Sequence, residues 1–138
     1  MKRCRRFAAG LSVLLAAGCS LSDSGIVPTA QGTVHVGPGR PVAGIFDCAQ
    51  RRLAELGARE ASWDHEVTLR DEASGRLETG HFDDDNVSGF RLRLQYRPVD
   101  GAVDLRLRGA GAYFTDLGVE GALDEFEQGF ESCLSPER

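Results

Sequence analysis

The chain has 138 residues, of which 16 are lysine or arginine and 21 are aspartate or glutamate, for a formal net charge of −5. This length allows one domain with a single core, and the acidic balance argues against a general attraction for nucleic acid or an anionic membrane surface. Without residues 1–18, which hold four basic residues and no acidic ones, the net charge would be −9.

The N-terminus has the charge pattern of an export signal. Its apolar run over residues 7–17 follows four basic residues, Lys2, Arg3, Arg5 and Arg6. A run of about 11 apolar residues suits a signal-peptide core and is too short to cross a bilayer. The run ends in Leu-Ala-Ala-Gly-Cys-Ser, residues 15–20.

Residues 15–20 resemble the lipobox of bacterial lipoproteins, in which small residues precede an invariant cysteine. The two small residues before Cys19 match the motif, whereas Ala16 departs from its usual leucine. The resemblance implies that residues 1–18 are a signal peptide and that the thiol of Cys19 carries a diacylglycerol. The alternative is cleavage by an ordinary signal peptidase, which accepts small residues before the cut and would leave a soluble secreted protein.

The same resemblance implies a location in the cell envelope, with the membrane as a partner through the lipid anchor. If the cell has two membranes, Ser20 implies the outer membrane, facing the periplasm. The reason is that lipoproteins retained in the inner membrane are associated with an Asp at this position.

The remaining cysteines favour a disulfide. Cys4 leaves with the signal and Cys19 is used by the lipid, so only Cys48 and Cys133 remain. An even pair of cysteines in an oxidising compartment is a disulfide candidate. The alternative is two buried free thiols; a redox-active pair is disfavoured because the chain has no Cys-x-x-Cys motif.

Residues 19–41 have the composition of a tether. Ser, Asp, Gly and Pro are frequent, and Gly-Pro-Gly-Arg-Pro over residues 37–41 disfavours regular structure, although residues 33–36 would allow a short edge strand. From residue 42 to residue 56, apolar residues recur at helical spacing along one stripe, and Gly57 is the expected stop.

Residues 61–109 alternate between apolar and polar side chains, which predicts strands. The first strand would bury Trp63, His65, Val67 and Leu69, and a second, of uncertain register, covers residues 76–82. Two clearer strands follow over residues 90–97 and 103–108. Between them Asp100-Gly101 is typical of a two-residue hairpin loop, which would pair Tyr96 with Leu105.

A second helix is predicted over residues 117–134, from a stripe of large apolar side chains. The expected fold is therefore a two-layer α+β domain over residues 42–135. It has a four-stranded antiparallel meander flanked by an N-terminal and a C-terminal helix, in the order α-β-β-β-β-α. Both helices would cover the apolar face of the sheet, and Cys48 would meet Cys133 between them.

The acidic run after residue 82 is a calcium candidate. Asp84, Asn86 and Ser88 have the spacing of the first ligands of a calcium loop, followed by Gly89. However, Gln95 stands where a bidentate Glu belongs, so the alternative is a solvated loop that joins two strands. The three histidines, at 35, 65 and 81, do not have the spacing of a zinc site.

No motif for nucleophilic catalysis occurs, and the paired carboxylates of the second helix lie on its polar face. We therefore expect a protein that is not an enzyme and has no cofactor. The polar face of the last two strands is rich in arginine, namely Arg91, Arg93, Arg97, Arg106 and Arg108.

This arginine-rich face is the candidate binding surface. With an acidic second helix on the other side of the sheet, the domain would be bipolar, and its open sheet would dock an anionic envelope protein or polymer. The ordinary alternative pairs the arginines with nearby acids, for example Arg97 with Asp104 and others with Asp64, Glu66 or Glu78. The expected function is a non-enzymatic accessory, assembly or binding module anchored in the envelope. The alternative function is a small periplasmic inhibitor or ligand-binding lipoprotein; the sequence does not define the oligomeric state.

Overall fold

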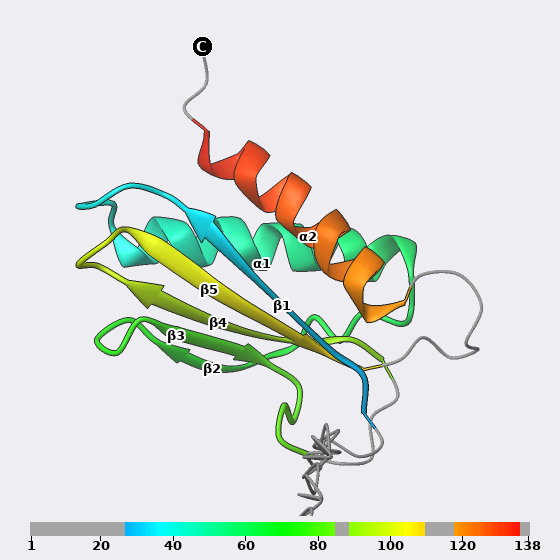
Figure 1. The fold of residues 1–138 in the computed structure, drawn as a ribbon. Coiled ribbons are helices and arrows are strands. Elements are labelled where there is room, and N and C mark those ends of the chain that lie inside the picture. The colour runs from blue at the N-terminus through cyan, green and yellow to red at the C-terminus, as the bar shows by residue number, and fades with distance from the viewer. Residues whose placement is uncertain (1–26, 85–88, 110–117, 136–138) are drawn as a thin grey trace, which may run out of the picture.

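The computed structural model describes residues 27–84, 89–109 and 118–135. Within these residues, five strands and two helices follow one another in the order β-α-β-β-β-β-α (Figure 1). The strands are β1 (Thr29–His35), β2 (Val67–Asp71), β3 (Arg76–Thr79), β4 (Arg91–Arg97) and β5 (Ala102–Arg108); the helices are α1 (Val42–Arg59) and α2 (Val119–Leu134). The fold class is α+β, as the sequence predicts.

The strands form one antiparallel sheet in the order β1-β5-β4-β3-β2. Strands β2 to β5 make the predicted four-stranded meander. The prediction that the sheet has only four strands is wrong, because residues 29–35, expected in the tether, pair with β5 along their whole length. The short strand predicted over residues 33–36 overlaps the second half of this edge strand.

Both helices lie on one face of the sheet, which gives the predicted two layers (Figure 1). Helix α2 packs against β1, β5 and α1. The interior is filled by large side chains that are at most 2% exposed, among them Phe46, Phe90, Phe126 and Phe130. The opposite face of the sheet has no helix over it in the described part of the chain, and we call it the open face.

In the β4–β5 hairpin the predicted apolar side chains face the core, but the register differs from the predicted one. Tyr96 lies opposite Val103, and not opposite Leu105. The strands are joined by four residues, 98–101, and the N–H of Gly101 donates to the carbonyl of Arg97 (3.0 Å). Because the shift is two residues, which is the period of a strand, the apolar side chains still share one face.

Both helices lie where the sequence predicts them, except that α1 ends later than expected. Helix α1 continues to Arg59, so the prediction that Gly57 stops it is wrong. Gly57 instead allows a close contact, because a Cβ built there would lie 2.4 Å from Nδ1 of His65. Helix α2 ends at Leu134 as predicted, whereas residue 117 lies outside the described residues.

Strand β2 is shorter than predicted and is bulged. Trp63 is buried as expected, but His65 is exposed and Leu69 is 38% exposed, so their assignment to the core is wrong. The register against β3 shifts between Val67 and Leu69, which places Leu69 opposite Glu78 on the open face.

The bulge also turns Arg70 toward the helices. Its Nη1 lies 3.0 Å from Oδ1 of Asp47 on α1, and its guanidinium carbon lies 5.5 Å from the centre of the Phe46 ring. Hydrogen bonds to the carboxylates of Glu72 and Asp47 raise the pKa of Arg70. Arg70 therefore covers one edge of the core with its charge held at the surface.

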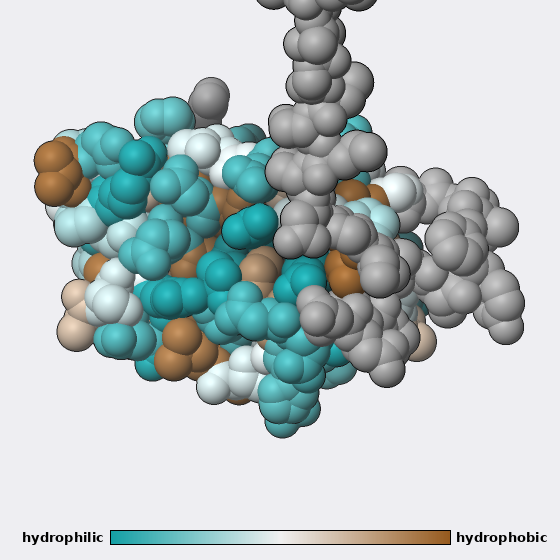
Figure 2. Space-filling model, turned by 60° about the horizontal axis from the view of Figure 1, so that its bottom comes forward, coloured by the Kyte–Doolittle hydropathy of each residue, from teal (hydrophilic) through white to brown (hydrophobic). Residues whose placement is uncertain are grey.

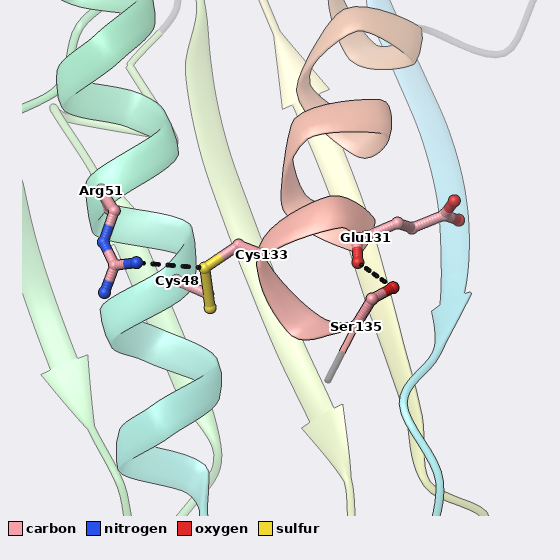
Figure 3. Close-up of a disulfide and its surroundings, with 5 residues drawn as sticks. All are labelled: Cys48, Arg51, Glu131, Cys133 and Ser135. Atoms are coloured by element: carbon pink, nitrogen blue, oxygen red, sulfur yellow. Dashed lines mark hydrogen bonds between the residues drawn. A yellow bond between two sulfur atoms is a disulfide. The ribbon is translucent and has the colours of Figure 1, made fainter. Parts of the chain in front are cut away.

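A disulfide joins the two helices, as predicted. Cys48 of α1 and Cys133 of α2 are bonded, and their Cα atoms lie 5.7 Å apart (Figure 3). The two cysteines are separated by 85 residues in the sequence. Arg51 lies beside the bridge, with Nη1 3.7 Å from Sγ of Cys133. The bridge links the segments that precede and follow the meander.

Candidate functional site

The five arginines of the candidate binding surface have different environments. Arg91 is 9% exposed, so its assignment to an open binding face is wrong. Its Nη1 donates to the carbonyl of His81, and its Nε lies 3.9 Å from Oδ2 of Asp64. These contacts give Arg91 a structural role at the end of β4.

Arg93 is held by two carboxylates. Its Nε lies 2.6 Å from Oε1 of Glu78, and its Nη2 lies 2.7 Å from Oδ2 of Asp83. Its guanidinium carbon also lies 4.1 Å from the centre of the Phe82 ring, a cation–π contact. Much of its positive charge is therefore compensated inside the domain.

Arg97 and Arg108 are also engaged. Arg97 lies 3.1 Å from Asp104 and 3.3 Å from Asp100, and Arg108 donates to the carbonyl of Phe82 (3.0 Å). The alternative that pairs Arg97 with Asp104 and other arginines with neighbouring acids is thus found for most of the group. Their charges contribute little to a basic surface.

Arg106 differs from the other four. Its side chain is exposed, and it makes no hydrogen bond or ion pair with any residue that the structure describes. In the sheet it lies directly opposite Arg93 on one side and Gln31 on the other. Because Glu78 and Asp83 compensate the charge of Arg93, Arg106 is the cation of this cross-strand pair that is left to attract an anion.

Arg106 borders a hollow of about 490 Å³ on the open face, over strands β1, β5 and β4. The hollow is lined by Gln31, Gly32, Thr33, Arg93, Gln95, Asp104, Leu105 and Arg106. Asp104 is already engaged, because its carboxylate accepts a hydrogen bond from the hydroxyl of Thr33 (3.0 Å) and forms an ion pair with Arg97. The side chains of Gln31 and Gln95 add neutral polar groups near the two arginines.

The space-filling view is consistent with a polar recognition surface. The face of the molecule seen in Figure 2 is mainly hydrophilic, with small separate hydrophobic areas. A hydrophobic interface core would need a larger contiguous apolar patch. Recognition on such a surface depends on hydrogen bonds and charge.

Helix α2 carries a group of four carboxylates on one of its sides. Glu120, Asp124, Glu127 and Glu131 are spaced so that they share one side of the helix, and we call them the acidic stripe. None of the four forms an ion pair with a described residue, whereas Glu125, on the side that faces α1, pairs with Arg59 and lies 4.0 Å from Arg52.

Glu127 is the central residue of the acidic stripe. Its Oε1 is buried against Gly32 of β1 without a hydrogen-bond partner among the described residues. Burial, and then the charges of Asp124 and Glu131, raise the pKa of Glu127 above its ordinary value. This contact leaves no signal in the sequence, because it depends on how α2 packs against β1.

The calcium candidate falls mostly outside the described residues. Asp84 is exposed in a turn, where its N–H donates to the carbonyl of His81 (3.0 Å), and Asn86 and Ser88 are not described. Across residues 27–84, 89–109 and 118–135, no three His, Cys, Asp or Glu side chains converge as metal ligands.

The predicted signal and lipidation site also lie outside the described residues, which begin at residue 27. Neither α1 nor α2, the helices of the described part, is long and apolar enough to cross a membrane.

No family model, curated protein or solved structure matches the chain. Its function is therefore inferred from its own residues. Two features stand out, namely the hollow beside Arg106 and the acidic stripe beside β1.

Proposed function

We propose that this protein is a lipid-anchored envelope protein without enzymatic activity, whose domain docks a carboxylate of a partner in the hollow on the open face. The observation that carries the proposal is Arg106, an exposed cation in a polar hollow, directly opposite a second arginine and without a partner of its own in the described chain. A carboxylate bound there would gain a charge-assisted hydrogen bond from the guanidinium of Arg106.

The proposed location depends on other residues. The charged and apolar N-terminus is typical of an export signal, and the residues around Cys19 resemble a lipobox. The Cys48–Cys133 bridge supports maturation in an oxidising compartment. If the cell has two membranes, Ser20 favours the outer one. The anchor would hold the domain close to its partner, which raises the local concentration of both.

The packing favours docking over ligand binding in a deep pocket. A small-molecule site between the layers would need an apolar cavity of several hundred Å³. That space is instead occupied by close-packed aromatic and aliphatic side chains, with Trp63 5.3 Å from Phe90 and Phe126 5.4 Å from Phe130 between ring centres. A ligand there would have to displace these rings.

A titration followed by NMR tests the proposal. The soluble Cys19→Ser form of the mature chain is labelled with ¹⁵N and titrated with acetylated triglutamate, and triglutamine serves as the neutral control. We expect amide shifts that map to the hollow on β1, β5 and β4, with triglutamate only. The variant Arg106→Glu should abolish these shifts, whereas Arg51→Glu, the same charge change on α1, should leave them unchanged.

Two results would contradict the proposal. In one, triglutamate shifts amides outside the hollow only. In the other, Arg106→Glu keeps the wild-type shifts and affinity. Because Arg106 is exposed, the variant should fold normally, and its thermal midpoint is the check. Cross-linking in cells from a benzophenone side chain at Thr33 then identifies the partner, and Arg106→Glu should remove the adduct.

A further inference from the structure

The two edges of the sheet differ in how they are protected. Edge strand β2 is bulged between Val67 and Leu69 and carries Arg70 and Asp71, devices that discourage another strand from pairing. Edge strand β1 has seven residues in unbroken register with β5, without proline, bulge, lysine, arginine or carboxylate. Its outer edge is therefore suited to accept a further strand.

The backbone of β1 presents half of its hydrogen-bonding groups to this outer edge. The N–H of Val36 donates to the carbonyl of Gly101 (2.8 Å), and the N–H of Gly109 donates to the carbonyl of Pro28 (3.0 Å). Because antiparallel pairing alternates, the even-numbered residues face β5 and the odd-numbered residues face outward. The outward residues are Thr29, Gln31, Thr33 and His35, and no described strand pairs with them.

The acidic stripe lies along this same edge. Glu127 touches Gly32 at the middle of β1, and Figure 3 shows Glu131 pointing toward β1 and away from α1. The stripe extends along α2 at a spacing of three to four residues from Glu120 to Glu131. A strand added to β1 would therefore have carboxylates beside it on the helical side of the sheet.

We propose that the outer edge of β1 binds an extended segment of another protein by strand addition, and that this segment carries lysine or arginine at every second position. The segment's backbone pairs with the outward groups of Gln31, Thr33 and His35. Its side chains point alternately to the open face and to the helical side. The basic side chains lie on the helical side, beside the acidic stripe. This site is separate from the hollow and does not depend on Arg106.

The charge of the acidic stripe also disfavours pairing of β1 with the same strand of a second copy of this chain. A seven-residue strand centred on Gly32 could pair with itself around a two-fold axis, with Gln31 opposite Thr33 of the other copy. The two stripes would then meet across the axis, with like charges on both sides. This arrangement repels a second copy and attracts a basic segment.

Hydrogen exchange tests the site directly, in the soluble Cys19→Ser form of the mature chain. In the free protein the outward amides of Gln31, Thr33 and His35 should exchange rapidly, and those of Gly32 and Val34 slowly. The probe is acetyl-Thr-Lys-Thr-Lys-Thr-Lys-Thr-amide, and the same peptide with Gln in place of Lys is the neutral control. We expect the lysine peptide to slow the three outward amides at least tenfold, and the glutamine peptide to slow them much less.

Two variants separate the backbone from the charge. Gln31→Pro removes one outward N–H and none that faces β5, so it should abolish peptide binding while the sheet stays intact. Asp124→Asn with Glu131→Gln should weaken binding about fivefold in low salt, as expected for two exposed ion pairs. Its matched control, Glu55→Gln with Glu60→Gln, changes the same number of carboxylates on and just after α1 and should have no effect.

Four results would overturn the proposal. Outward amides that are slow in the free, dilute protein would show that the edge is already covered. Protection that rises with protein concentration alone would assign the edge to a second copy. Equal protection by both peptides would rule out a role for the acidic stripe. No protection by either peptide would rule out binding at the edge of β1. Arg106→Glu must leave lysine-peptide binding unchanged, which separates this site from the hollow.

Discussion

Loss of the Cys48–Cys133 bridge is the perturbation whose effect is best defined by the structure. The bridge closes a segment of 85 residues that contains most of α1, the whole meander and most of α2. In the loop-entropy model, a closed loop of this length stabilises the folded state by about 4.5 kcal/mol at 25 °C. For a domain of this size that corresponds to a fall of roughly 20 °C in thermal midpoint.

The assay is urea denaturation of the oxidised protein, the reduced protein and the Cys48→Ala/Cys133→Ala variant. The reduced protein keeps both sulfur atoms, so it separates the loss of the cross-link from the loss of side-chain packing. We expect both altered forms to lose most of the free energy of unfolding, with a similar loss in each. A difference of less than about 1 kcal/mol between the oxidised and reduced proteins would refute the loop-entropy argument.

Two further predictions concern single side chains. Gly101→Ala should destabilise the domain by about 2 kcal/mol or more in denaturant titrations, because φ is +64° and the new Cβ would lie 2.3 Å from the carbonyl carbon of Gly37. An unchanged free energy of unfolding would show that Gly101 does not have this backbone conformation. Glu127→Gln should raise the thermal midpoint at pH 7. The pKa of Glu127 is raised in the folded state, so its ionised form disfavours folding at neutral pH. The gain should vanish well below the ordinary glutamate pKa of 4.5, where the carboxyl is protonated in both the folded and the unfolded state; a gain that persists at pH 3 would contradict this explanation.

The clear alternation in β4 and β5 predicted both strands and their buried faces, because strand period and burial depend on local sequence. The register depended on a distant contact. Gly101 packs against the backbone of Gly37, and the connection takes four residues where Asp100-Gly101 suggested two. A shift of two residues leaves the hydrophobic pattern unchanged, so the pattern alone had no means of detecting it.

Strand β1 and the bulge in β2 were harder to predict. The buried side of β1 consists of Ala30, Gly32 and Val34, which are small because α2 lies close to the strand, and small residues give a weak hydrophobic signal. In β2, a one-residue shift moves Leu69 outward and Arg70 inward, against the local alternation. Such a shift depends on pairing with β3 and not on the residue types.

The candidate site was predicted in part. Arg106 is exposed on the polar face of the hairpin, as the sequence predicts. The other four arginines are engaged within the domain, with carboxylates or with backbone carbonyls. Their partners come from β3, from the loops and from β5 itself, so only the tertiary arrangement shows which cation lacks a partner among the described residues. The acidity of α2 was visible in the sequence, whereas its position beside the outer edge of β1 was not.

The proposed anchor at Cys19 determines where both binding surfaces would act. Intact-mass analysis of the protein extracted from membranes tests it most directly, with a Cys19→Ala variant as the control. We predict a mature chain that begins at Cys19 and carries a diacylglycerol on its thiol, and a control that is lost from the membrane fraction. A mature chain with an unmodified Cys19, or a chain that retains residues 1–18, would contradict the proposed lipid anchor.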